Sequence, residues 1–249
     1  MSVIPDAPPV DALCAQITRE GFAFVHSAAT TALLTGHDAT ALRDWPAFAA
    51  SWNDMPLDTY MADGGRYRRR RYATLSVAAG SNAATLEPHQ PHYQSLDYNA
   101  LNGGIARHYE PIRAYIVAGA TLSSLLVLCY RVFNQLRPAT HWHVEVHQFR
   151  IEARVGESGQ PTPEGVHRDG VDYVMVMMIE RHNTREGTTT IHGPDGTTLA
   201  GFTLTEPLDM TLVDDHRCLH GVTPVVPLDA TQSAWRDVLV VTFRQRGRG

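Results

Sequence analysis

Two segments far apart in the chain carry residues that could do chemistry. The first, residues 163–170, reads PEGVHRDG and contains His167 and Asp169, and the second contains His220. In the facial triad, two imidazoles and one carboxylate bind one face of a non-haem Fe(II) and leave three positions open. A His-X-Asp pair with a remote His supplies that residue set, and an iron oxygenase is therefore our first hypothesis.

The spacing of the pair supports a shared ligand. Alternate side chains of a β-strand point to opposite faces, so His167 and Asp169 would share one face. Alone the triplet is weak, because a loop or half-buried strand explains it equally well in a chain with 13 His. The context strengthens it, since residues 171–179 read as a buried strand and His220 lies in a strand–turn–strand pattern at 212–222. Antiparallel strands between the two segments could bring them together at the mouth of a β-barrel.

Arg236 begins the most strand-like run of the chain, residues 234–243, whose buried core we expect at 238–243. At a barrel mouth, a guanidinium can hold a carboxylate with two parallel hydrogen bonds, which an ammonium cannot do. Without the neighbouring triad, a solvated Arg flanking a core strand would be the better interpretation. Arg244, which has the same strand parity, is the second candidate for this role.

In this order the motifs resemble the Fe(II)/2-oxoglutarate-dependent dioxygenases. More narrowly, they resemble the bacterial family that includes the L-isoleucine 4-hydroxylases, through residues 163–172, 207–215, 220–224 and 235–243. The upstream residues 51–53, 58–61 and 67–72 fit the same family. The resemblance extends from about residue 20 to residue 244, and the His-Arg-Asp-Gly block is its most specific part. One departure is the gap of fifteen residues between His220 and Arg236, which is wider than in many relatives.

The resemblance implies roles for these residues. His167, Asp169 and His220 would bind Fe(II), and Arg236 would bind the distal carboxylate of the cosubstrate 2-oxoglutarate. The oxidant would be O₂, with ascorbate as the expected reductant. The implied activity is hydroxylation of an unactivated C–H bond of a free L-amino acid, with an aliphatic side chain favoured and with release of succinate and CO₂. The amino-acid part of this expectation rests on the resemblance alone.

Other interpretations stay open. A peptide or protein hydroxylase could use the same triad. A cupin or a non-catalytic jelly-roll binding module could instead bind a metal on residues 141–150, where alternation places His141, His143, Glu145 and His147 on one face. Same-face neighbours on a straight strand lie about 6.6 Å apart, so two of these ligands could share a metal and all four could not. The alternate residues Trp142, Val144 and Val146 would then face the core or the helices.

Residues 66–71 contain five arginines, the densest charge cluster of the chain. In a strand, Arg69 and Arg71 would share one face, and Arg68 and Arg70 the other, so that some guanidiniums point inward. An inward Arg could hold a substrate carboxylate, although structural ion pairing is the simpler interpretation. RNA binding would need a broader basic surface.

The composition excludes several classes of protein. With 249 residues, 43% hydrophobic content and a formal charge of -5, the chain gives no sign of a nucleic-acid or membrane partner. All 21 basic residues are Arg, which excludes Schiff-base, pyridoxal-phosphate and P-loop chemistry because each uses a Lys. Three scattered cysteines fit a reducing compartment, and the N-terminus does not read as a signal peptide. We therefore expect a cytoplasmic protein with a small-molecule substrate, and a homodimer stays open.

The pattern of elements predicts a mainly β fold with flanking helices (α+β) around a double-stranded β-helix, the cupin-like jelly roll. We expect a single domain over residues 1–249, with an N-terminal part at about 1–138 packed on a jelly-roll core at about 139–244. The N-terminal part should contain a helix at 9–20 closed by Gly21, a strand at 22–25, and a second helix after Asp38 that Pro46 interrupts. The uncharged residues 114–130 are too short for a membrane span and predict a buried helix, and residues 80–104 predict a loop near the site.

Overall fold

The computed structural model describes residues 9–81, 83–99 and 101–247. The N-terminal residues 1–8, most of the segment that did not read as a signal peptide, lie outside this range. Five helices occur in the described residues: α1 (Val10–Glu20), α2 (Ser27–His37), α3 (Trp45–Ala50), α4 (Ala114–Val117) and α5 (Ala120–Leu136). The strands are β1 (Phe22–Val25), β2 (Arg68–Val77), β3 (Ala84–Leu86), β4 (Trp142–Ala153), β5 (Tyr173–His182), β6 (Thr184–Glu186), β7 (Thr189–His192), β8 (Thr198–Phe202), β9 (Met210–Asp214), β10 (Leu219–Val222), β11 (Val225–Pro227) and β12 (Ala234–Gln245).

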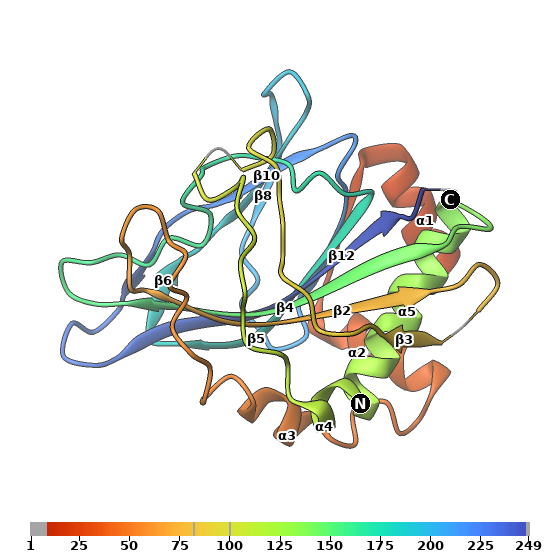
Figure 1. Cartoon of the computed structure of the whole chain (residues 1–249), viewed down its shortest axis with the longest axis horizontal. Helices are drawn as coiled ribbons and strands as arrows, with labels where there is room; N and C mark the ends of the chain where they lie inside the picture. The colour runs from red at the N-terminus through yellow and green to blue at the C-terminus, as the bar shows by residue number, and fades with distance from the viewer. Residues whose placement is uncertain (1–8, 82, 100, 248–249) are drawn as a thin grey trace, which may run out of the picture.

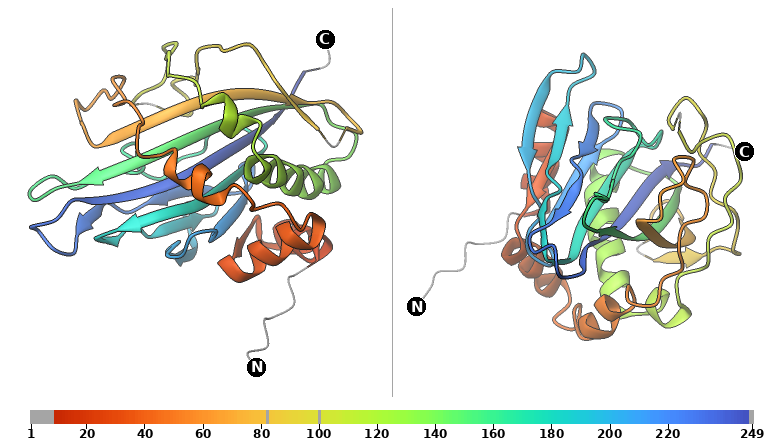
Figure 2. Two further views of the ribbon diagram at one scale, coloured as in Figure 1. Left: turned by 90° about the horizontal axis from the view of Figure 1, so that it is seen from below. Right: turned by 90° about the vertical axis from the view of Figure 1, so that its left-hand side faces the viewer.

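The strands form a jelly roll, as the sequence predicted. A large sheet has the order β1-β9-β5-β12-β4-β2-β3, and a small sheet has the order β10-β7-β8. The pair β11-β6 extends one end of the molecule. The helices lie along one face of the large sheet, while β8 and β10 lie over its other face (Figures 1 and 2). This layering leaves the interval between the two sheets for a site.

Strict alternation along the central strands separates core from cavity. On β4, Trp142, Val144 and Val146 are fully buried in the core shared with the helices, which confirms the prediction for these three residues. The intervening Glu145 and His147 line the cavity between the sheets. Strand β12 follows the same rule, with Leu239, Val241 and Phe243 in the core and Val238, Val240 and Thr242 in the cavity wall. The pleat of the large sheet therefore gives it one apolar face for the helices and one mixed face for chemistry.

Helix α5 is held against the sheet by its apolar side and by a distant cap. Its leucines recur at helical spacing, and Leu122 and Leu125 are almost fully buried. The carboxylate of Asp44 accepts hydrogen bonds from the N–H groups of Ala120 and Thr121, both at 2.9 Å. These are donors that the helix itself cannot satisfy. The predicted buried helix is confirmed, although it begins after a break at Gly119.

The N-terminal helices differ in part from the prediction. Helix α1, its closure by Gly21 in the left-handed conformation, and β1 are confirmed. The second helix, however, is α2, which ends before Asp38, and only the short α3 follows. Pro46 lies in the first turn of α3, where its missing N–H has no partner to lose. Pro46 therefore begins a helix instead of interrupting one. Across the described residues, no helix is long and apolar enough to cross a membrane.

Candidate active site

His167 and His220 face each other across one antiparallel bridge. His167 lies in the segment before β5, and His220 lies in β10. Each backbone N–H donates to the carbonyl of the other residue at 2.9 Å, and the ring centroids are 4.7 Å apart. Directly opposed residues place their side chains on the same face. The prediction that His167 and Asp169 lie on a regular strand is wrong, because His167 forms only an isolated bridge and residues 168–172 contain no strand.

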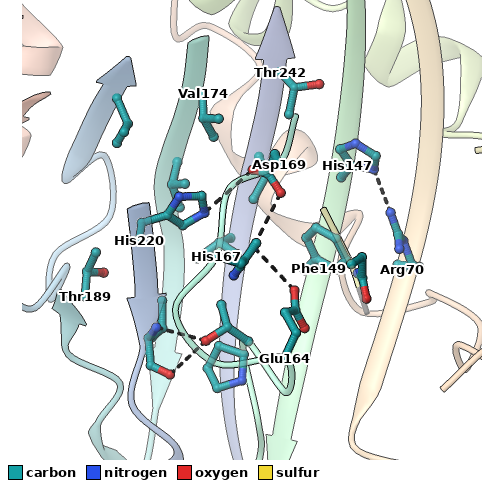
Figure 3. Close-up of a pocket in the computed structure, with 18 of the residues that line it drawn as sticks. Arg70, His147, Phe149, Glu164, His167, Asp169, Val174, Thr189, His220 and Thr242 are labelled. Atoms are coloured by element: carbon teal, nitrogen blue, oxygen red, sulfur yellow. Dashed lines mark hydrogen bonds and ion pairs between the residues drawn. The ribbon is translucent and has the colours of Figure 1, made fainter. Parts of the chain in front are cut away.

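Asp169 completes the set between the two imidazoles (Figure 3). Its Oδ1 lies 3.5 Å from Nε2 of His167, and its Oδ2 lies 3.6 Å from Nε2 of His220. One ligand atom from each of the three residues falls within 4.8 Å of the others. The structure thus brings together the three residues that the sequence singled out.

A backbone carbonyl fixes the orientation of His167. Its Nδ1 lies 3.0 Å from the carbonyl oxygen of Gly165, to which only an N–H can donate. This leaves Nε2 directed at Asp169, and Glu164 Oε1 lies 3.3 Å from the same Nε2. Burial lowers the pKa of His167, but Asp169 and Glu164 outweigh burial and raise the pKa to about 9. A metal ion bound at Nε2 therefore has to displace a proton.

The other two residues are in the protonation states that a divalent metal requires. Burial opposes ionisation of Asp169, but the hydrogen bond from His167 and the charges of the two histidines hold its pKa below the usual range. Burial, followed by the charge of His167, lowers the pKa of His220 to about 4, so this imidazole is neutral at neutral pH. A carboxylate and two imidazoles without a thiolate form the donor set of a facial triad, and these residues fit Fe(II).

The loop that carries Asp169 is fixed by a second carboxylate. Asp215 accepts hydrogen bonds from the backbone N–H groups of Asp169 at 3.1 Å, Gly170 at 2.8 Å and Val171 at 3.1 Å. The side-chain amide of Gln94 donates to the carbonyl of Asp169 at 3.1 Å. Burial, and then the charge of Asp169, raises the pKa of Asp215 to about 6. These bonds hold the Asp169 carboxylate in place before any metal binds.

Arg236 lies in the wall of the same cavity and is 2% exposed. The neighbouring Asp237 is already paired with Arg150 by hydrogen bonds of 2.8 and 2.6 Å. Among the described residues, Nε and Nη2 of Arg236 have no hydrogen-bond partner. Burial, followed by the charge of Arg181, lowers the pKa of Arg236 to about 9. Because an unpaired buried guanidinium is costly, this position suits an anionic ligand.

The second candidate for that role, Arg244, occupies a different environment. It is exposed near the end of β12 and lines an adjoining pocket that shares Asp169 and Glu145 with the site, but it does not line the cavity that contains His167 and Arg236. Between the charged groups, the wall of this cavity is mostly apolar, with Phe149, Val174, Val176, Ile191, Val238 and Val240. The cavity therefore combines a metal-ligand set, a buried guanidinium and a surface for an aliphatic group.

The arginine run divides between two faces, as predicted for a strand. Arg68 and Arg70 line the cavity, and Arg68 pairs with Asp58 at 2.7 Å. On the opposite side, Arg69 pairs with Glu152 at 2.6 Å and Arg71 with Glu110 at 2.9 Å. Part of the run is thus structural, and part of it faces the space in which a substrate would bind.

A second cluster lies on β4, where the sequence suggested an alternative metal site. His92, Glu145 and His147 offer ligand atoms within 4.8 Å of one another. The guanidinium Nη2 of Arg70, however, lies 2.7 Å from Nδ1 of His147, and an Arg can only donate. This places the proton of a neutral His147 on Nε2, which then has no lone pair for a metal. His141 is exposed and belongs to neither cluster.

Sequence reasoning missed several residues of the cavity wall. The predicted loop at residues 80–104 is confirmed in part: His92, Gln94 and Asn99 line the cavity, but residues 84–86 form the short strand β3. Arg107, which is 2% exposed, lines it as well. These residues come from a segment without hydrophobic periodicity, so no local pattern in the sequence distinguishes them from surface positions.

The jelly roll and the two-histidine, one-carboxylate donor set are together those of the non-haem iron oxygenases. The family model described as 2OG-Fe dioxygenase matches residues 49–242, and the chain belongs to this family. The prediction of a 2-oxoglutarate-dependent iron dioxygenase is thereby confirmed. Proteins of this family use Fe(II), 2-oxoglutarate and O₂.

Individual relatives agree with this assignment. The chain is 25% identical over 235 residues to a 3(1)-hydroxy-L-isoleucine 4-dioxygenase from Pantoea ananatis, covering 92% of this chain and 94% of the relative. It is 25% identical over 195 residues to an L-isoleucine-4-hydroxylase from Bacillus thuringiensis, covering 75% of this chain and 80% of the relative. The crystal structure of a bsmA homologue from Methylobium petroleophilum PM1 superposes with a TM-score of 0.87 at 34% identity, covering 100% of this chain and 98% of that one.

Proposed function

We propose that the protein hydroxylates an unactivated C–H bond of a free L-amino acid, with an aliphatic side chain favoured. His167, Asp169 and His220 would hold the iron, and Arg236 would bind the distal carboxylate of 2-oxoglutarate. The observation that carries the proposal is the presence of the donor set and the unpaired buried guanidinium in one cavity. The names of the two isoleucine-acting relatives support the amino-acid part.

Fe(II), with 2-oxoglutarate and O₂, supplies the oxidising chemistry: one oxygen atom enters the product hydroxyl group and the other enters succinate, with loss of CO₂. The protein contributes binding and orientation. Arg236 aligns the cosubstrate from its far end through a bidentate contact. The valines of β5 and β12 line the cavity, where they would contact an aliphatic side chain and exclude water from the target carbon. Asp215 keeps the Asp169 carboxylate oriented through the loop amides.

The test measures succinate release after the protein is loaded with Fe(II) anaerobically and then exposed to air with ascorbate and 2-oxoglutarate. Each of the twenty free L-amino acids is supplied separately. We expect stimulation by Ile, Leu, Val or Met, with one hydroxylated amino acid formed per succinate. Silence across the panel with iron bound would refute the free amino acid as substrate and favour a peptide or carrier-bound one. No stimulation in a protein without bound iron would favour a non-catalytic binding module.

A cytoplasmic location, a homodimer and a single domain stay predictions.

A further inference from the structure

Within the described residues, the cavity contains a second buried guanidinium with nitrogens that have no hydrogen-bond partner. Arg68 is paired with Asp58 at 2.7 Å, and Arg70 lies 4.0 Å from Asp58 and donates to His147. Arg107 differs from both, because its Nε and Nη2 are buried and have no hydrogen-bond partner within the described part of the chain. Burial and, among smaller causes, the charge of Arg107 lower the pKa of Arg70 to about 10, so the two like charges lie close enough to repel each other. An anion between them would relieve that repulsion.

The backbone places Arg107 beside an anionic group. Arg107 and His92 form an isolated antiparallel bridge, with N–H to carbonyl distances of 2.9 and 3.0 Å in the two directions. Opposed residues in such a bridge project to the same side, about 5 Å apart at Cβ. The Nδ1 of His92 in turn lies 3.2 Å from Oε2 of Glu145. Arg107 and Glu145 thus both neighbour His92 on a common wall of the cavity.

Glu145 is an ionised carboxylate that retains capacity for a cation. Burial would raise its pKa, but its contacts with His143, His147 and His92 hold the pKa well below the usual range. Its Oε1 accepts a hydrogen bond from the hydroxyl of Tyr72 at 2.9 Å and lies 3.3 Å from Nε2 of His143. Its Oε2 lies 3.6 Å from Nε2 of His147, too far for a full hydrogen bond. A carboxylate offers about four acceptor sites, so Oε2 can accept from a further donor.

We propose that this wall binds the main chain of the amino-acid substrate, with the α-carboxylate on Arg107 and the α-ammonium on Glu145. The assignment rests on the proposed function and specifies its substrate as a zwitterion with both groups free. Each of the two unpaired guanidiniums then has its own anion, the distal carboxylate of 2-oxoglutarate on Arg236 and the amino-acid carboxylate on Arg107. The apolar wall of β5 and β12 is left for the side chain that carries the target C–H bond. A capped or peptide-bound amino acid would leave at least one of the two charges unpaired.

The experiment compares matched ligands on matched variants. L-Isoleucine, L-leucine, L-valine and L-methionine are supplied as free acids, as carboxamides and as des-amino acids, to the wild type and to Arg107→Gln, Glu145→Gln and Arg113→Gln. Arg113 is the control, because its exposed side chain pairs with Asp54 outside the cavity. The readouts are the KM values for the amino acid and for 2-oxoglutarate, and calorimetric binding of each ligand to the Ni(II)-loaded protein with 2-oxoglutarate present.

For the wild type we expect the acid to bind about 100-fold more tightly than the carboxamide, as for loss of a charge-assisted bidentate contact. In Arg107→Gln, binding of the free acid should weaken by the same factor, while the affinities for the carboxamide and for 2-oxoglutarate stay within about 2-fold of the wild type. The preference for the acid over the carboxamide should therefore disappear. Glu145→Gln should abolish the preference for the amino acid over its des-amino analogue. Arg113→Gln should match the wild type. If Arg107→Gln does not fold, Arg107→Lys tests the same point, because it keeps the charge and loses the planar fork.

The assignment would be overturned by an Arg107 variant that still prefers the acid over the carboxamide. It would also be overturned by a variant that loses affinity for 2-oxoglutarate instead of the amino acid. In that case amino acids would still stimulate succinate release, so the proposed function would survive. Absence of stimulation by every free acid would refute the proposed function, and this assignment with it.

Discussion

Replacing Arg236 by Met should separate ligand binding from stability. Arg236 is almost fully buried and lacks a partner for Nε and Nη2 in the described residues, so the folded protein bears the cost of a desolvated charge. Burial, followed by the charge of Arg181, lowers its pKa to about 9. A lowered pKa of a base means that folding disfavours the charged form, and this penalty is fully present at pH 7, below the folded pKa. Methionine keeps much of the aliphatic volume and removes the charge.

The expected effects on the two properties have opposite signs. Loss of two charge-assisted hydrogen bonds should weaken the binding of 2-oxoglutarate by about 3 kcal/mol, which is roughly a 100-fold increase in Kd. Replacement of the unpaired charge by an apolar group should stabilise the ligand-free protein by about 1–3 kcal/mol. For a chain of this size, each kcal/mol corresponds to about 2–4 °C in Tm. A cosubstrate concentration 100-fold above the wild-type Kd would stabilise the wild type by about 2.7 kcal/mol and the variant by about 0.4 kcal/mol.

The assay is thermal unfolding of the Ni(II)-loaded protein with and without 2-oxoglutarate, together with the KM for 2-oxoglutarate in the succinate assay. Arg244→Met is the matched control, because it removes an exposed Arg from the same strand and should change neither property. A variant at Arg236 that is less stable than the wild type and keeps its cosubstrate affinity would refute the reasoning. A loss of affinity in Arg244→Met would move the cosubstrate site to that residue.

Two further predictions concern the metal site and its support, and a third concerns the buried ion pair between Arg68 and Asp58. Asp169→Ala should leave a folded protein without bound iron, measured by metal analysis after desalting, and without coupled turnover, measured by succinate release. The control Asp195→Asn, in an exposed hairpin turn, should retain both. Asp215→Asn should lower iron affinity by about 10–100-fold while iron still binds, because it weakens the acceptor for the loop amides, and an unchanged affinity in a metal titration would contradict this. Asp58→Asn should lower the free energy of unfolding by about 3–5 kcal/mol, as measured by urea unfolding, because it leaves Arg68 unpaired. Burial opposes ionisation of Asp58, but the charges of Arg68 and Arg70 outweigh burial and lower its pKa from the usual value. Its contribution is therefore present above the unfolded pKa and is lost as the pH falls through the folded pKa, so the difference between wild type and variant should close in acid.

Part of the metal site could be predicted from the sequence because two of its three ligands lie close together in the chain. His167 and Asp169 are two residues apart, and that spacing predicted a shared face even though the segment is a bridge followed by a loop. The position of Arg236 at the start of a strongly β-patterned run also identified it, since the pattern fixed which residues of β12 share its face. Resemblance to known dioxygenases then gave these residues roles that spacing alone cannot give.

The N-terminal helices were harder because local signals conflicted. Helix α2 contains five alanines and threonines in its first five positions after Ser27, and only Thr30 and Leu34 are fully buried, so it has no clear apolar stripe. The helix expected after Asp38 rested on four apolar residues at helical spacing, which suggested a longer helix than α3: Leu42, Trp45, Phe48 and Trp52. Those side chains do join the core, but a short helix between two turns brings them there. Periodicity identified the buried residues correctly and gave the wrong element length.

The substrate-facing wall could not have been assembled from sequence, for a reason that bears on its function. Glu145 was visible as one of four polar residues alternating on a strand, but its neighbour Arg107 lies thirty-eight residues earlier in an irregular segment, and only the bridge to His92 brings the two together. No periodic pattern encodes a pairing between a loop and a strand. Loops on a rigid sheet can change without loss of the core. Relatives that keep the iron ligands and Arg236 can therefore differ at the positions of His92 and Arg107, and a relative that lacks this wall should no longer require a substrate with a free α-carboxylate and a free α-ammonium.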